Sequence, residues 1–260
     1  MVTAMHRLLL PLLLLVGCDI VGGEPPGDDD DVPLPCEGDT DERPVVFETV
    51  DEVLLEADYQ PAVTQGMGAV VLVHMIPPGN DRSGYPQQVR DEFNDLDLTV
   101  LNLDRRGAGE SEGTPEDAYL GRGGLWDLEA AVGFLTGEFA ADCPVDPERI
   151  LLVGASNGTT SVLDYAVEHE ADLPDVAGLI FMSPGGYTQN QNTIEGNEDV
   201  PIQWLYPTNE PFSSGFVDDS ERWEFIERGE AHGTRMFDRG DLEADTVGDM
   251  VDFMTALLVD

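Results

Sequence analysis

The sequence predicts one α/β domain built on a mostly parallel β-sheet with helices on both faces. Short apolar segments of strand type alternate with amphipathic segments of helix type over most of its 260 residues. Gly68–His74 (GAVVLVH) is a continuous apolar run, which is typical of a strand buried on both faces of a parallel sheet. A chain of this length can bury one sizeable core, and no repeat or linker divides its folded part into two domains.

The first half of the domain is expected to begin with a hairpin. Val45–Val50 and Val53–Ala57 are short segments of β type, separated by a pair of acidic residues. The strand Gly68–His74 follows, and Gln87–Phe93 then forms a short amphipathic helix. The next strand is expected at Leu98–Leu103.

The second half continues the alternation of helices and strands. A helix is expected at Leu120–Leu135, because apolar residues recur there at intervals of three or four residues. The remaining elements, in chain order, are the strand Arg149–Val153, the helix Gly158–Glu168, the strands Val176–Met182, Ile202–Tyr206 and Trp223–Ile226, and the closing amphipathic helix Leu242–Leu258. This order implies right-handed crossovers between parallel strands.

The N-terminus has the pattern of a secretory signal peptide over residues 1–17. Met1–Arg7 carries one positive charge, and Leu8–Val16 is an apolar run interrupted only by Pro11. The run is too short to span a bilayer, which needs about 20 apolar residues, and it suits the apolar region of a signal peptide. Leu15–Cys18 (LVGC) resembles a bacterial lipoprotein processing site, at which a small residue precedes the cysteine that becomes lipid-modified.

That resemblance implies that Cys18 is the acylated N-terminus of an exported protein, anchored in the bacterial cell envelope. An ordinary cleaved signal peptide with an incidental cysteine is the alternative. Residues 18–43 are expected to form an acidic flexible tether, because Asp19–Pro35 is rich in Gly, Pro and Asp and cannot build a core. The folded domain then spans residues 44–260.

Two further cysteines remain, Cys36 and Cys143. In an exported protein, two such cysteines most simply form one disulfide. Neither is spaced from a histidine as metal ligands are. We therefore expect a disulfide, no metal site and no catalytic cysteine.

The composition is strongly acidic. Asp and Glu number 53 against 12 basic residues, all of them Arg, which gives a formal net charge of −41. Such a surface repels nucleic acid and anionic lipid headgroups, so we expect neither as a partner. It is typical of a solvated surface suited to high external salt, where screening weakens self-repulsion. A specific cation-binding role is the alternative.

Gly154–Gly158 (GASNG) is the first motif that indicates chemistry. It fills the G-x-S-x-G pattern between an expected buried strand and a helix, the context in which this pattern marks a nucleophile. The sharp turn lifts Ser156 above the sheet, and the flanking glycines spare it side-chain clashes. The N-terminal N–H groups of the helix point at charge that develops beside the serine. A serine that only caps the helix is the alternative.

A nucleophilic serine needs a base, and the chain has only four histidines. His6 belongs to the expected signal peptide, His169 to the polar end of a helix, and His74 to the end of a strand. Only His232 lies in a glycine-flanked loop after the last expected strand, from which it can reach the serine and still turn. An exposed loop histidine is the alternative.

A third group must orient His232 and stabilise its imidazolium. Glu210 follows the strand Ile202–Tyr206 and lies between the serine and the histidine in the chain, so it is the expected acid. Asp218 and Asp219 are the alternatives, because carboxylates are plentiful in this sequence.

The chain order Ser156, Glu210, His232 is that of the α/β-hydrolases, and several other segments resemble that family. His74–Pro77 (HMIP) resembles its H-G-x-P oxyanion turn, with Met75 where glycine is usual. Further similar segments are Leu103–Ser111 (LDRRGAGES, like D-x-R-G-x-G-x-S), Tyr206–Pro211 (like H-G-x-x-D-P, with Glu for Asp) and Ala231–Gly233 (like G-H-G). The resemblance covers the chain from about Val45 to Val259.

The resemblance implies that the backbone N–H groups of Ile76 and Asn157 hold the oxyanion. Only about twenty residues separate Met182 from Ile202, where lipases and haloalkane dehalogenases of this fold usually place a helical lid. We therefore expect no lid domain and a likeness to dienelactone hydrolases and small carboxylesterases. Dienelactone hydrolases use a cysteine nucleophile and haloalkane dehalogenases an aspartate, so Ser156 argues against both chemistries.

The expected function is that of a serine hydrolase which cleaves carboxylic esters (EC 3.1.1) through an acyl-enzyme and needs no cofactor. Its expected partners are a small-molecule ester and, through the anchor on Cys18, a membrane; the chain is expected to be a monomer. A peptidase or amidase on the same residues is the second hypothesis. A non-catalytic surface lipoprotein that uses the fold as a binding module is the third.

Overall fold

The computed structural model describes residues 34–36, 38–137, 143–184, 199–210, 221–238 and 240–259. The expected signal peptide and the expected lipidation site, Cys18, lie outside these residues. None of the described helices is long and apolar enough to cross a membrane.

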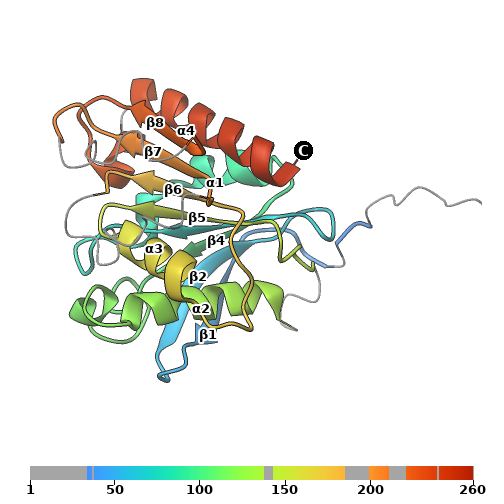
Figure 1. Cartoon of the computed structure of the whole chain (residues 1–260). Coiled ribbons are helices and arrows are strands. Elements are labelled where there is room, and N and C mark those ends of the chain that lie inside the picture. The colour runs from blue at the N-terminus through green and yellow to red at the C-terminus, as the bar shows by residue number, and fades with distance from the viewer. Residues whose placement is uncertain are drawn as a thin grey trace, which may run out of the picture. The chain divides into compact units, whose positions relative to one another are not determined.

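Within the described residues, eight strands form one sheet in the order β1-β2-β4-β3-β5-β6-β7-β8 (Figure 1). The strands are β1 (Arg43–Glu48), β2 (Leu54–Gln60), β3 (Ala69–Val73), β4 (Thr99–Leu103), β5 (Ile150–Ala155), β6 (Gly178–Met182), β7 (Ile202–Tyr206) and β8 (Trp223–Glu227). β1 and β2 form an antiparallel hairpin, and β2 pairs antiparallel with β4. All other neighbours are parallel, as the sequence predicts.

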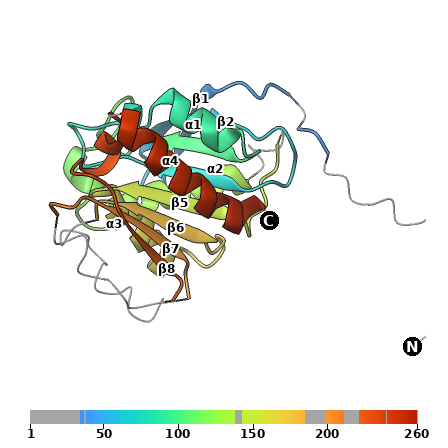
Figure 2. The same cartoon turned by 90° about the horizontal axis from the view of Figure 1, so that it is seen from above.

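Helices cover both faces of the sheet. They are α1 (Gln87–Asn94), α2 (Gly123–Thr136), α3 (Gly158–Glu168) and α4 (Gly240–Met254), which continues as a π-helical turn over Thr255–Val259. α1 and α4 lie on one face and α2 and α3 on the other (Figures 1 and 2). The expected fold class is therefore confirmed, and the described residues contain no lid domain.

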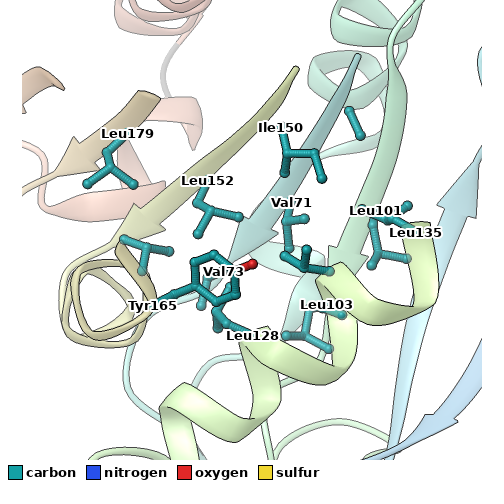
Figure 3. Close-up of a cluster of buried hydrophobic side chains, with 14 of the residues drawn as sticks. Val71, Val73, Leu101, Leu103, Leu128, Leu135, Ile150, Leu152, Tyr165 and Leu179 are labelled. Carbon is teal, nitrogen blue, oxygen red and sulfur yellow. The ribbon is translucent and has the colours of Figure 1, made fainter. Parts of the chain in front are cut away.

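The central strands are apolar throughout because both of their faces are covered. Val71 and Val73 of β3 pack under α2 and α3, in the cluster that Figure 3 shows, together with Leu128 of α2 and Tyr165 of α3. The alternate residues of β3, Val70 and Leu72, contribute to the core under α1 and α4. This arrangement explains why the Gly68–His74 segment shows no alternation of apolar and polar residues.

A disulfide joins Cys36 to Cys143, the pairing that the sequence predicts. The backbone N–H of Cys36 also donates a hydrogen bond to the carbonyl of Val63 (2.7 Å). The described end of the segment 18–43, expected to be a flexible tether, is therefore held against the domain.

The helix expected to begin at Leu120 begins instead at Gly123. Gly121 has a φ of +69°, which lies in the left-handed region, so a right-handed helix cannot pass through it. Leu120, on the far side of this break, is 60% exposed. The sequence also gives no sign of the 3₁₀ helices at Arg82–Gly84, Pro115–Ala118 and Gly233–Asp238.

Candidate active site

Ser156 lies on a sharp turn between β5 and α3. Its φ of +51° is in the left-handed region, which costs a non-glycine residue about 1–3 kcal/mol. The glycines on either side allow the chain to come this close: a Cβ on Gly154 would lie 2.8 Å from the backbone of Thr159, and one on Gly158 would lie 2.5 Å from the carbonyl oxygen of Val73. The turn holds the serine at the carboxyl end of the sheet.

His232 lies between Ser156 and Glu210. Its Nε2 is 2.6 Å from the hydroxyl oxygen of Ser156, and its Nδ1 is 2.7 Å from Oε1 of Glu210. Because the carboxylate can only accept, Nδ1 carries the proton and Nε2 is free to accept the serine proton. The structure therefore brings the three predicted residues together in the geometry of a nucleophile, a base and an orienting acid.

The loop that carries His232 is tied to the ends of two neighbouring strands. The backbone N–H of Gly233 donates to the hydroxyl of Ser183, just after β6 (2.8 Å). Thr208, just after β7, donates both its N–H and its hydroxyl to the carbonyl of Gly229 (2.8 and 2.9 Å). These contacts fix the loop of the candidate base relative to the loop of the candidate acid.

The two expected oxyanion donors lie at the carboxyl ends of neighbouring parallel strands. Ile76 follows β3, and Asn157 directly follows Ser156 at the start of α3. Within the described part of the chain, neither backbone N–H has a hydrogen-bond acceptor. Met75 lies at the position where the family pattern has glycine. Its side chain fits because residue 233 is a glycine: a Cβ there would lie 2.7 Å from the sulfur of Met75. Gly233 thus makes room for the methionine.

Two buried residues next to these donors, His74 and Arg105, were not predicted from the sequence to act in the site. His74 places Nδ1 2.7 Å from the carbonyl of Met75 and Nε2 3.0 Å from the N–H of Arg105. Burial lowers the pKa of His74 to about 3, so its imidazole is neutral at pH 7. The guanidinium of Arg105 donates to the side-chain oxygen of Asn157 (2.9 Å). Both residues belong to the family-like segments, but only their contacts reveal this role.

The alternative acids, Asp218 and Asp219, lie outside the described residues. Among the residues that are described, no group of three His, Cys, Asp or Glu side chains is placed to hold a metal ion. The groups that the structure brings together at the site are the side chains of Ser156, His232 and Glu210.

The sequence model of a hydrolase family, described as serine aminopeptidase, S33, matches residues 65–214. The chain belongs to this family. The matched region includes Ser156 and Glu210. No curated protein matches the sequence.

Solved structures with the same fold include two esterases and a dienelactone hydrolase. An esterase from Pyrococcus furiosus is 15% identical to this chain, with a TM-score of 0.62 over 87% of this chain and 98% of the esterase. Esterase RhEst1 from Rhodococcus sp. is 16% identical, with a TM-score of 0.59 over 83% and 99%. The dienelactone hydrolase from Anabaena variabilis is 15% identical, with a TM-score of 0.60 over 84% and 98%. The resemblance to the α/β-hydrolases is confirmed, and membership of the family supports a serine hydrolase.

Proposed function

We propose that this protein hydrolyses carboxylic esters of small molecules through an acyl-enzyme on Ser156. The observation that carries the proposal is the pair of hydrogen bonds by which His232 joins Ser156 to Glu210. Nε2 of His232 takes the hydroxyl proton as the serine oxygen attacks the acyl carbon, and then returns it to the leaving alcohol. Glu210 keeps the imidazole oriented and stabilises its charged form.

The backbone N–H groups of Ile76 and Asn157 would hold the oxygen that becomes negative during attack. A donor of this kind typically contributes about 2.7–4 kcal/mol to transition-state stabilisation. Water then attacks the acyl carbon with His232 as the base, which releases the acid and restores the serine. Each step uses only groups of the chain and water.

The name of the family favours a second candidate, the cleavage of amides. Its description refers to an aminopeptidase, whereas two of the solved structures are named as esterases. The two reactions share the acyl-enzyme and differ in the leaving group that His232 must protonate. Rates on p-nitrophenyl acetate and on amino-acid p-nitroanilides distinguish them, and we expect the ester to be cleaved faster.

Replacement of Ser156 by alanine tests the proposal. We expect Ser156→Ala to abolish both p-nitrophenyl acetate hydrolysis and labelling by a fluorophosphonate probe, because the attacking oxygen is gone. Ser83→Ala, at an exposed position of the 3₁₀ helix Arg82–Gly84, is the matched control and should keep both. Labelling that persists in folded Ser156→Ala protein would show that another residue is the nucleophile.

A further inference from the structure

Arg105 contacts both turns that carry the proposed oxyanion donors, Ile76 and Asn157. It takes no part in the hydrogen bonds that join Ser156, His232 and Glu210. The side chain is fully buried. Its Nη1 donates to Oδ1 of Asn157 (2.9 Å), and its Nη2 donates to the carbonyl of Ala118 (2.5 Å) and the hydroxyl of Ser161 (3.1 Å). Asn157 and Ser161 are four residues apart and so lie on one side of α3. The guanidinium therefore holds the start of α3 to the segment before α2.

This grip bears directly on the backbone next to the nucleophile. Asn157 supplies one proposed oxyanion donor through its N–H, and its side chain is the group that Arg105 binds. A planar guanidinium with two bonded nitrogens limits rotation more than a single-point contact does. Because the guanidinium holds the side chain of Asn157, the backbone N–H of Asn157 can change its direction less.

The backbone of Arg105 holds the other side of the site. Its N–H donates to Nε2 of His74 (3.0 Å), and Nδ1 of the same ring donates to the carbonyl of Met75 (2.7 Å). Ile76, the second proposed donor, is the next residue. Because the buried imidazole is neutral, it can accept at one nitrogen while it donates at the other. One residue thus contacts both turns that supply N–H groups.

A packing role alone does not account for an arginine at this place. Burial lowers the pKa of Arg105 to about 10, so the guanidinium stays charged at pH 7; Asp127 and Asp164 act in the opposite direction. A buried charge has a desolvation penalty that an apolar side chain of similar volume avoids. The hydrogen bonds to Asn157, Ser161 and Ala118 are what the charged group adds.

We infer that Arg105 is a positioning residue for the oxyanion site: its side chain fixes Asn157, and its N–H fixes the turn that carries Ile76. The inference rests on the proposed function and names a determinant of its rate. A donor displaced by a fraction of an ångström binds the ground state almost as well but stabilises the developing charge less. Loss of Arg105 should therefore lower kcat while KM changes little.

A double-mutant cycle tests this inference. We expect Arg105→Met and Asn157→Leu each to lower kcat on p-nitrophenyl acetate by about tenfold to a hundredfold, with KM within about twofold of the parent value. The kcat of the double variant should be no lower than that of the less active single variant, because both changes break the same contact. Losses that multiply would show that Arg105 does not act through Asn157 and would overturn the inference.

Arg106→Met is the matched control. Arg106 is the adjacent buried arginine, but its side chain pairs with Asp51 and Asp127 instead of reaching Asn157. We expect this variant to lower the melting temperature while kcat of the folded protein stays within about threefold of the parent. An equal fall of kcat in both arginine variants would indicate that the segment after β4 has become less ordered as a whole, and this result would contradict the inference.

Amide hydrogen exchange gives a readout that does not depend on activity. In the full chain, Arg105→Gln should speed exchange in the segment Asn157–Ser161, whereas Arg106→Met should not. Unchanged exchange would contradict the positioning role even if Ser156 proves to be the nucleophile. Faster exchange in a chain without Ser156-dependent hydrolysis would instead refute the proposed function and leave the structural contact intact.

Discussion

Asp164 is a buried carboxylate with one oxygen that no hydrogen bond reaches. It lies on α3, two turns after Ser156, and the described residues offer its Oδ1 no partner. Desolvation, reinforced by repulsion from Glu168, raises the pKa of Asp164 to about 7. Because this value is above that of the unfolded chain, the folded state binds the proton more tightly. The contribution of Asp164 to the free energy of unfolding is fully present below about pH 4 and is lost as the pH rises to about 7.

Asp164→Asn should therefore stabilise the fold at neutral pH more than at acid pH. The free-energy difference between variant and parent is expected to grow by up to about 1.4 kcal/mol per pH unit between pH 4 and 7 and then to level off. Urea unfolding at several pH values measures it. Asp172→Asn, on the exposed segment after the same helix, controls for the loss of one charge. A difference that is constant from pH 4 to 8 would contradict the assignment.

The role of some single residues can be predicted from the sequence, whereas the role of others cannot. Ser156, His232 and Glu210 could be proposed together because the motif, the chain order and the scarcity of histidines restrict the choice. The contacts of Arg105 could not, since its partners lie between 13 and 56 residues away in the chain. No spacing rule links an arginine to an amide and a hydroxyl on a distant helix. Such a contact exists only once the sheet has brought β4 and α3 together.

The junction between β3 and α3 depends on the absence of a side chain at Gly158. A Cβ there would lie 2.5 Å from the carbonyl oxygen of Val73 and 2.6 Å from that of His74. Both contacts are with backbone, which cannot move aside as the end of a flexible side chain can. An added methyl group must therefore push the start of α3 away from the turn that carries Ile76.

Gly158→Ala should consequently lower both stability and activity. We expect a loss of about 1–3 kcal/mol in the free energy of unfolding, as for overpacking elsewhere, and a fall in kcat of at least tenfold. Gly248→Ala in α4 is the matched control: its Cβ would meet nothing within 4 Å, and alanine should stabilise the helix by about 0.5–1 kcal/mol. Chemical denaturation and ester hydrolysis measure both. A neutral Gly158→Ala would mean that the junction tolerates separation.

Elements were predictable where a regular pattern spans them. The strands β3 to β7 appear within two residues of their expected positions, because their apolar runs are buried on both faces. The 3₁₀ helix Gly233–Asp238, which follows His232, has no such signature. It begins at a glycine with a φ of +56° and is held by packing against Met75 and the hydroxyl of Ser183. These contacts come from other strand ends and leave no periodic trace in the sequence.

Many of the few arginines in the molecule form ion pairs with carboxylates of the same chain. Arg82 pairs with Glu56, Asp58 and Asp104, at nitrogen–oxygen distances between 2.5 and 3.0 Å. Such partly buried pairs are screened less by salt than exposed charges are. The whole chain contains 53 acidic residues and only 12 arginines, so carboxylates far outnumber the groups that can neutralise them. The net charge of −41 is thus carried largely by carboxylates that repel one another.

This distribution predicts that salt stabilises the protein. Raising NaCl from about 0.01 M to about 1 M shortens the screening length from about 30 Å to about 3 Å, which weakens repulsion between exposed carboxylates more than it weakens the pairs of Arg82. Each kcal/mol of relieved repulsion should raise Tm by about 2–4 °C in a domain of this size. The same titration near the sequence pI of about 4.1, where most of the net charge is gone, should show a much smaller rise. A flat or falling Tm at neutral pH would show that the excess acidity does not destabilise the fold, and an equal rise at both pH values would point to a salt effect unrelated to charge repulsion.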